Sequence, residues 1–297
     1  MTDRPVLSIV REISRHPGAT VAEGVFEGRR AAIKTFSSYN GFRRESGALA
    51  AMARAGAPVA HPMWAGAYGD RHVLIQSWVD GTPGLDAFRA ARGADRAELV
   101  ELAAATHAHL CRAALDGPGL GQHVVEALTG SRADAWPQIL AAQIGKWLSR
   151  VSLESLSLLG GGERLARLLE AARAAPAEPH TIVHCDYLFR NLIIGSPEAA
   201  VVIDFGAALV GDPRYDLAKL VWCDLDGSEG ELAGRFITAW VERTGLAAAP
   251  ELINLYVCCH SLAAVAWVDK QSSPTLADSD FRRRALQTFA ATPKHWL

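Results

Sequence analysis

Three aspartates and one asparagine lie close together in the stretch TIVHCDYLFRNLIIGSPEAAVVIDFGAALVGDPRYDLAKL, residues 181–220. Asp186, Asn191, Asp204 and Asp216 stand at or beside the ends of two short apolar runs, NLII and AVVID, which predict strands. A carboxylate beside a buried strand is costly unless a cation or hydrogen-bond donors compensate it. The nature of those partners therefore indicates the chemistry of this stretch.

The spacing of these residues is that of the protein-kinase signature set. His184, Asp186 and Asn191 fit the pattern H-x-D-x-x-x-x-N, and Asp204 opens the sequence Asp-Phe-Gly further along. The first pattern alone occurs often by chance. Joined to the second, and to GDPRYDLA after it, the pattern indicates a kinase.

Phosphoryl transfer explains why these residue types occur together. The transferred group is held by metal and positive charge, and Mg²⁺ takes oxygen ligands, few of them from protein. We expect Asn191 and Asp204 to supply those oxygens, and Asp186 to accept the proton of an attacking hydroxyl. Lys34, on the predicted strand AAIKTF, would hold the α- and β-phosphates, and Glu45 on the following helix would fix its position.

The segment departs from protein kinases and resembles the aminoglycoside phosphotransferase family, within the wider group of choline, homoserine and fructosamine kinases. Its HCDYLFRN, IDFG and GDPRYDLA are similar to that family's H-G-D-x-x-x-x-N loop, I-D-[FWL]-G or related strand end, and G-D-P-x-x-D-L-A motif. There is no A-P-E motif and no room after Gly206 for an activation loop, and Leu188 stands where Ser/Thr kinases usually have Lys. The resemblance is closest over 181–220, extends to 20–82 and is weak elsewhere.

The resemblance implies an α+β, two-lobed protein-kinase-like fold with the nucleotide between the lobes. A small antiparallel-sheet N-lobe would comprise residues 1–80, with a hinge near 76–81. Residues 82–297 would form a mostly helical C-lobe that carries the catalytic loop and the acceptor site.

The same resemblance places the nucleotide base at the end of the strand in HVLIQSWVDG. Gln76 would lie there, and main-chain groups of Ser77 to Val79 would pair with adenine or guanine, so ATP and GTP both stay open. Asp216 would brace the catalytic loop rather than touch the metal. His184 is expected to be a structural brace as well, not a base.

Two positions differ from the family pattern. Cys185 replaces the usual glycine, which we expect a small side chain without a β-branch to permit. The phosphate-covering segment SRHPGAT holds one glycine, so backbone N–H groups near Arg15 to Ala19 are expected to face the phosphates.

The first 80 residues predict a small sheet with one helix. SIVREIS, TVAEGVF and RRAAIKTF predict strands, with Glu27-Gly28 as a hairpin turn. GFRRESGALAAMARAG predicts a helix that ends at Gly56, and RHVLIQSWVDG predicts a strand that leaves through Asp80-Gly81.

From about residue 82 the periodicity is helical. The predicted helices are DRAELVELAAATHAHLCRAAL, AWPQILAAQIGKWLSRV, GGERLARLLEAARAA, LAGRFITAWVERTG, opened by a capping box at Ser228 to Glu231, and LINLYVCCHSLAAVAWV. The last of these contains a His and polar groups, so a buried helix is favoured over a membrane span. The segments LSLLGGGE and DKQSSPTLADSD are expected to be mobile loops.

Acidic residues follow the GDP motif, where the resemblance places the acceptor pocket. Asp224, Asp226, Glu229 and Glu231 would suit a polycationic aminoglycoside. A loop followed by a capped, charged helix start explains the same residues without a ligand. Asp269 is a further candidate.

Other polar and aromatic residues have ordinary structural explanations. Arg190 suits a phosphate, but a surface arginine is the simpler interpretation. His107 and His109 are expected in a core or on a helix face. The tryptophans of the apolar helices are expected in the core: Trp222, Trp240 and Trp267.

Composition excludes several classes. The 297 residues are 49% hydrophobic and 21% charged, as in one large domain or two lobes. A net charge of −2 does not favour a nucleic-acid binder, and the N-terminus lacks the apolar core of a signal peptide. The five cysteines form no CxxC pair, which indicates reduced thiols in a cytoplasmic protein without a membrane partner.

The sequence predicts a Mg²⁺-dependent small-molecule O-kinase that uses ATP or GTP. The favoured acceptor is an aminoglycoside or another sugar- or nucleoside-containing antibiotic, in resistance or in biosynthesis. The alternatives are a metabolite kinase of the choline or homoserine type and a non-catalytic nucleotide-binding protein. The oligomeric state stays open.

Overall fold

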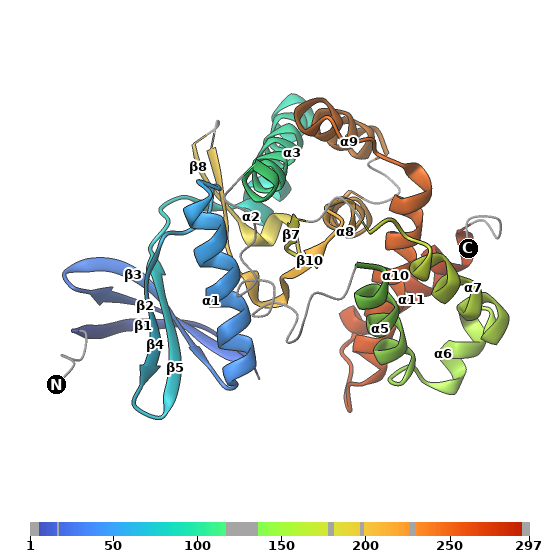
Figure 1. Ribbon diagram of the computed structural model, residues 1–297, viewed down its shortest axis with the longest axis horizontal. Helices are drawn as coiled ribbons and strands as arrows, with labels where there is room; N and C mark the ends of the chain where they lie inside the picture. The colour runs from blue at the N-terminus through green and yellow to red at the C-terminus, as the bar shows by residue number, and fades with distance from the viewer. Residues whose placement is uncertain are drawn as a thin grey trace.

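The computed structural model shows two lobes, a sheet with one helix and a larger helical part (Figure 1). It describes residues 6–16, 18–116, 136–177, 181–196, 199–225 and 230–292. The α+β, two-lobed architecture expected from the sequence is confirmed.

The N-lobe is a five-stranded antiparallel sheet in the order β1-β2-β3-β5-β4. Its strands are β1 (Leu7–His16), β2 (Ala19–Phe26), β3 (Arg29–Phe36), β4 (Pro62–Tyr68) and β5 (Arg71–Ser77). Glu27 and Gly28 both have positive φ, 48° and 76°, as a two-residue hairpin turn requires. β4 was not predicted from the sequence, because its GAY segment with alternate exposure gives no long apolar run.

Helix α1 (Tyr39–Arg54) packs against this sheet and faces the C-lobe (Figure 1). Ser38 caps its N-terminus by accepting a hydrogen bond from the Gly41 N–H. Leu49 and Met52 on its inner side are almost fully buried and belong to a core cluster that continues into the C-lobe. Glu45 lies on the buried part of the same helix.

The chain enters the C-lobe just after β5. β6 (Thr82–Pro83) pairs with β8 (Leu192–Ser196), and β8 pairs with β9 (Ala199–Val202). A second small sheet joins β7 (Thr181–Val183) to β10 (Leu209–Gly211). Short 3₁₀ turns, η1 (Phe189–Asn191) and η2 (Phe205–Ala207), lie where the polar motifs meet these strands.

Helices make up the rest of the C-lobe. They are α2 (Gly84–Ala90), α3 (Gly93–Asp116), α5 (Trp136–Leu148), α6 (Leu153–Leu158), α7 (Gly161–Arg173), α8 (Arg214–Asp224), α9 (Gly230–Thr244), α10 (Pro250–Asp269) and α11 (Leu276–Ala291). Within the described ranges, only α10 is long and apolar enough to cross a membrane. Most of it is buried against α5, α8 and α11, as expected for a core helix.

Two segments predicted as mobile loops are largely helical. Residues 156–163 span the end of α6 and the start of α7, and Ser152 caps α6. Residues 269–280 include the start of α11, where Thr275 and Asp278 form a capping box. The capping box of α11 begins a helix inside a stretch whose Ser and Pro content had indicated a loop, whereas α6 begins at Leu153, before the other stretch. The predicted capping box of α9 includes Ser228, which lies outside the described residues.

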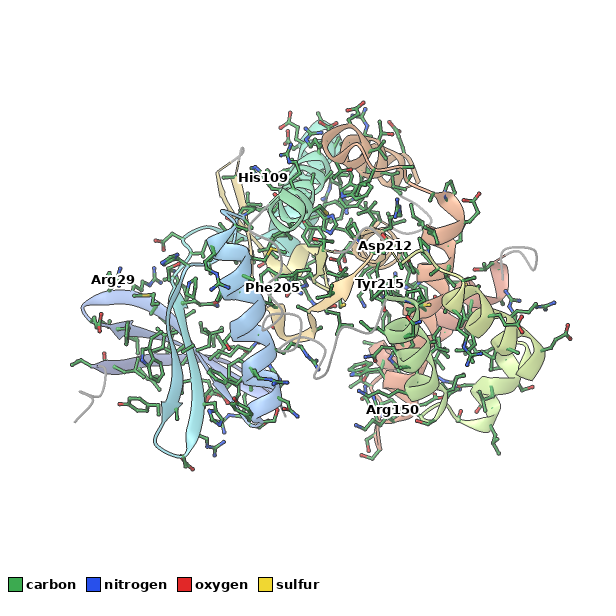
Figure 2. The ribbon with its side chains drawn as sticks, viewed as in Figure 1. Arg29, His109, Arg150, Phe205, Asp212 and Tyr215 are labelled. Carbon is green, nitrogen blue, oxygen red and sulfur yellow. The ribbon has the colours of Figure 1, made fainter. Side chains whose placement is uncertain are left out.

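Most of the aromatic and histidine expectations hold. Trp222 and Trp240 are buried, and His109 is exposed on α3 (Figure 2). Trp267 is 56% exposed, so the prediction that it belongs to the core is wrong. It lies on the outer side of α10, with Phe281 of α11 edge-on to it at 6.5 Å.

The GDP motif holds the start of α8 in a buried polar network. Asp212 accepts two hydrogen bonds from Arg214 Nη1, both at 3.0 Å, and one from the Tyr256 hydroxyl at 2.9 Å. Trp136 Nε1 donates to that hydroxyl at 3.0 Å. The Trp136 ring covers Gly211, where a Cβ would lie 2.1 Å from a ring carbon. The glycine of this motif is therefore required by packing.

Gly211→Ala is expected to lower the free energy of unfolding by about 1–3 kcal/mol, because the buried Trp136 ring must move. Denaturant titration measures the change. Gly234→Ala is the control, since nothing lies within 4 Å of its Cβ on exposed α9 and alanine favours the helix by about 1 kcal/mol. Equal midpoints for both variants would contradict the packing argument.

Candidate active site

Lys34 lies between two carboxylates that come from opposite lobes. Its Nζ is 2.8 Å from Glu45 Oε1, 2.7 Å from Glu45 Oε2 and 2.7 Å from Asp204 Oδ1. Lys34 is 6% exposed and Glu45 is 2% exposed. Lys34 is therefore not a solvated strand lysine, and Glu45 is not an exposed helix glutamate.

When both carboxylates are ionised, this cluster holds one more negative than positive charge. Burial raises the pKa of Glu45 to about 7, the Lys34 ammonium opposes the shift, and the Asp204 charge adds to it. Burial also acts to raise the pKa of Asp204, but Lys34 outweighs it and the pKa is lowered. Burial acts to lower the pKa of Lys34, but the two carboxylates outweigh it and raise that pKa. The excess charge is one that a cation would neutralise.

The backbone around Asp204 is shaped for this cluster. Asp204 has φ 66° and ψ 67°, a left-handed conformation that is uncommon outside glycine and frequent at functional sites. A Cβ on Gly206 would lie 3.1 Å from Glu45 Oε2 and 3.3 Å from Asp204 Oδ1. Glycine at 206 therefore leaves room for the two carboxylates.

Asp186 is surrounded by donors. Asn191 Nδ2 donates to its backbone oxygen at 2.7 Å and to Oδ2 at 3.0 Å. Arg190 Nη2 contacts both carboxylate oxygens, at 2.9 and 2.7 Å. Lys219 Nζ of α8 lies 3.7 Å from Oδ1. Arg190 is a surface arginine, as expected, with a side chain 56% exposed, and it also forms an ion pair with Asp186 that the sequence did not predict.

Lys219 was missed in the sequence. The signal was present, since Lys219 follows Asp216 by three residues on a helix and so shares its face. Asp216 bonds to the catalytic loop, which places Lys219 beside that loop as well.

Asp216 is buried, 1% exposed, and holds the catalytic loop through its backbone. Its Oδ2 accepts from the His184 N–H and its Oδ1 from the Cys185 N–H, both at 2.7 Å. His107 Nε2 lies 3.3 Å from Oδ2. Trp240 Nε1 donates to His107 Nδ1 at 2.9 Å, so the imidazole carries its proton on Nε2 and donates to Asp216. These are the contacts that a bracing role requires.

His184 lies on the inner side of the catalytic loop. Its Nδ1 accepts from the Asp186 N–H at 3.3 Å, and its Nε2 lies 2.9 Å from the Ile203 carbonyl. Its ring packs against Phe205 at 4.8 Å, and Figure 2 shows Phe205 between α1 and the C-lobe. His184 thus ties the catalytic loop to the strand that ends at Asp204.

Cys185 occupies a left-handed backbone conformation, with φ 64°. This explains the glycine of the family pattern, and side-chain size was the wrong criterion for the substitution. A side chain here costs about 1–2 kcal/mol. The N–H bond to Asp216 holds the strained conformation.

A hollow of about 360 Å³ lies between the lobes at these residues. It is lined by His16, Gly18, Ala19, Lys34, Phe36, Ser38, Gly41, Glu45, Cys185, Asp186, Asp204, Gly206 and Ala207. Lys34, Glu45, Asp186 and Asp204 therefore line one space.

The β1–β2 turn is tighter than the phosphate-covering loop expected from the sequence. Arg15 and His16 pair with Thr20 and Ala19 in the strand ladder. The Gly18 N–H donates to His16 Nδ1 at 3.3 Å. This amide is therefore not directed at the phosphates, contrary to the prediction that backbone N–H groups here would face them. The His16 side chain lines the hollow and is an additional candidate phosphate contact.

The predicted base-binding residues lie at the end of β5 and just after it. Gln76 lies between β3 and β4 in the sheet. The Ser77 N–H donates to the His61 carbonyl at 2.8 Å, and its Oγ accepts from the His61 N–H at 2.9 Å, so both groups are already engaged. Val79 follows in the link to the C-lobe and remains the predicted main-chain contact.

The predicted acceptor acids have internal partners. Asp224 accepts a hydrogen bond from the Phe189 N–H at 2.8 Å. Asp269 accepts from the Ser152 N–H and from Arg282 Nε, both at 2.8 Å, and so ties α10 to α6 and α11. The structure gives no support to acceptor binding by Asp269. Two further predicted acceptor residues lie outside the described residues: Asp226 and Glu229.

The oxygens of the two predicted metal ligands, Asp204 and Asn191, fit Mg²⁺, and Asp204 is among the residues that line the hollow. Asp204 is bound to Lys34 through Oδ1 only, and its side chain is 49% exposed. Asn191 uses Nδ2 for Asp186, which leaves its Oδ1 for a cation. Among the described residues no three His, Cys, Asp or Glu side chains cluster as a metal cage. Few protein oxygens suit an ion that keeps water and phosphate ligands.

One family model matches most of the chain. The model of the phosphotransferase enzyme family matches residues 27–252. No match was found among curated protein sequences.

Solved structures share the fold. A putative aminoglycoside phosphotransferase from Ralstonia eutropha has a TM-score of 0.70 at 15% identity and covers 99% of this chain and 93% of its own. A thermostable mutant of aminoglycoside phosphotransferase APH(4)-Ia, with ADP and hygromycin B, has a TM-score of 0.68 at 17% identity. The match covers 96% of this chain and 93% of the other. An ethanolamine kinase from Plasmodium vivax has a TM-score of 0.59 at 14% identity, and the match covers 98% of this chain and 82% of the other. The kinase-like fold is thereby confirmed.

The raised pKa of Glu45 predicts a pH effect on the nucleotide-free protein. Between the ordinary value of 4.5 and about 7 the folded state holds a proton that the unfolded state releases, so this residue's contribution to stability falls as pH rises. In urea titrations from pH 4.5 to 8, the free energy of unfolding should decline less with rising pH for Glu45→Gln than for wild type. An identical pH dependence would contradict the shift.

Proposed function

Because the chain belongs to the phosphotransferase enzyme family, we propose that it transfers the γ-phosphate of ATP or GTP to a hydroxyl of a small molecule. The observation that carries this proposal is the hollow that Lys34, Asp186 and Asp204 line together. These residues lie far apart in the chain, and phosphoryl transfer needs all three groups in one place.

The nucleotide would lie with its phosphates in this hollow. Lys34 would bind the α- and β-phosphates, held in position by buried Glu45. Mg²⁺, held by Asp204 and Asn191, would supply positive charge at the transferred group. Its arrival would also offset the excess negative charge beside Lys34.

Asp186 would accept the proton of the attacking hydroxyl. Its side chain is 27% exposed, so an acceptor can reach it. Asn191 fixes its orientation, and Asp216 and His184 fix the loop that carries it. A positioned base of this kind contributes about 10²–10⁴-fold to the rate.

The proposed acceptor is an antibiotic, an aminoglycoside or another natural product that contains a sugar or nucleoside. The solved relatives that are aminoglycoside phosphotransferases support this class. The ethanolamine kinase supports a metabolite kinase as the second candidate. A non-catalytic nucleotide binder is less favoured, because Asp186, Asn191 and Asp204 are all present.

Asp186→Ala is expected to reduce phosphate transfer by about 10²–10⁴-fold while nucleotide binding remains. Transfer is measured as mass gain over an antibiotic panel with ATP and GTP. Asp70→Ala, a change at a highly exposed turn aspartate, is the control. Retained turnover would remove Asp186 from the mechanism.

Asp204→Ala is expected to weaken binding of the Mg–nucleotide, because it removes a metal oxygen and a partner of Lys34. Calorimetry with Mg–AMP-PNP, and with AMP-PNP in EDTA, separates the two effects. The loss should be larger with Mg²⁺ than without. An equal loss would argue against a metal role for Asp204.

A further inference from the structure

Both carboxylate oxygens of the proposed base, Asp186, are already engaged. Arg190 Nη2 lies 2.9 Å from Oδ1 and 2.7 Å from Oδ2. Asn191 Nδ2 donates to Oδ2 at 3.0 Å, and Lys219 Nζ lies 3.7 Å from Oδ1, beyond hydrogen-bond distance. An attacking hydroxyl must itself donate to one of these oxygens before Asp186 can take its proton. Arg190 therefore competes with the hydroxyl for the same two atoms.

Arg190 is the donor that can move away from Asp186. Asn191 is 6% exposed and donates to the Asp186 backbone oxygen as well, so it is fixed within the loop. The Arg190 side chain is 56% exposed, and its hydrogen bonds to described residues go to Asp186 alone. An ion pair with this much exposure is weak. A ligand with contacts of its own can therefore displace Arg190.

A second carboxylate lies where the displaced arginine can be received. Asp224, at the end of α8, accepts the Phe189 N–H at 2.8 Å, so it lies beside the residue that precedes Arg190. Burial acts to lower the pKa of Arg190, but the charge of Asp186, joined by that of Asp224, outweighs burial and raises it. Arg190 thus lies within the influence of two acids and hydrogen-bonds to one of them.

We propose that Arg190 is a specificity-determining residue that favours the hydroxyl of the acceptor over water. The proposal rests on the proposed function and deepens it. In transfer, the hydroxyl gives its proton to Asp186, its oxygen bonds to the γ-phosphorus, and the bond between that phosphorus and the β–γ bridging oxygen breaks. Hydrolysis is the same step with water as the nucleophile.

The two nucleophiles differ in what they can spend on displacing Arg190. An acceptor is held by contacts remote from the reacting hydroxyl, and this binding energy can offset the loss of the ion pair with Asp186. Water has no such contacts. Arg190 therefore keeps Asp186 from activating water while no acceptor is bound, and the nucleotide is conserved.

The test measures nucleotide hydrolysis without any acceptor. Phosphate release from Mg–ATP and Mg–GTP is followed for the full chain and its variants. Arg190→Gln should hydrolyse about two- to fivefold faster than wild type, the change in rate that corresponds to an exposed ion pair. Arg190→Lys should stay near the wild-type rate, because an ammonium can replace the one guanidinium nitrogen that contacts Asp186. Arg150→Gln, a change at an exposed arginine far from Phe205 in Figure 2, should behave like wild type.

A double variant shows whether the additional hydrolysis uses Asp186. Asp186→Ala combined with Arg190→Gln should abolish the increase, and an increase that survives would overturn the proposal. Equal rates in wild type and Arg190→Gln, including no detectable release from either, or slower hydrolysis by Arg190→Gln, would overturn it as well.

Nucleotide binding separates this proposal from the proposed function. Arg190→Gln should bind Mg–AMP-PNP in calorimetry with wild-type affinity, because Arg190 is not among the described residues that line the hollow. A weaker affinity would place Arg190 on the nucleotide and overturn its role against water. Failure of wild type to bind Mg–AMP-PNP would instead refute the proposed function.

Discussion

A single buried ammonium group joins the lobes of this protein. Lys34 extends from the N-lobe sheet, pairs with Glu45 of α1 and reaches Asp204, two residues after the C-lobe strand β9. Burying a lysine is costly unless carboxylates surround it, and pairing one ammonium with buried Glu45 and half-exposed Asp204 leaves a negative charge uncompensated when both carboxylates are ionised. Sheet, helix and C-lobe strand are therefore held in one arrangement, and that arrangement is incomplete in charge until a cation arrives.

A second buried charge performs the same task within the C-lobe. Asp216 is 1% exposed, so water cannot hydrogen-bond to its carboxylate. Its donors are the backbone N–H groups of His184 and Cys185 and the His107 ring. The requirement that a buried carboxylate be satisfied fixes the loop, including the left-handed turn at Cys185. The orientation of Asp186 thus depends on Asp216 of α8, whose buried carboxylate holds the loop that carries Asp186.

The sequence was sufficient to predict the site residues that belong to contiguous motifs. The residues of HCDYLFRN, IDFG and GDPRYDLA are short-range patterns whose spacing reflects strand ends and helix starts, and Lys34 and Glu45 follow from the strand and helix they occupy. Arg190 and Lys219 were not assigned, because an arginine or lysine is ordinarily solvated. Arg190 reaches Asp186 from four residues along the same loop, and Lys219 reaches it through the packing of α8, which its spacing from Asp216 could have indicated. Trp267 was misplaced for the converse reason, since an apolar helix still has an outer side.

The connection between Asp204 and α8 is short and tightly packed. It consists of the short turn η2 and strand β10, pinned by the Trp136 ring over Gly211, and has no segment that a modifying enzyme could order or release. Lys34 and Glu45 already pair without any such event. The position of Asp204 relative to α8 is thus set by the packing of a short connection, and no rearrangement of a long loop is needed to bring Asp204 to Lys34.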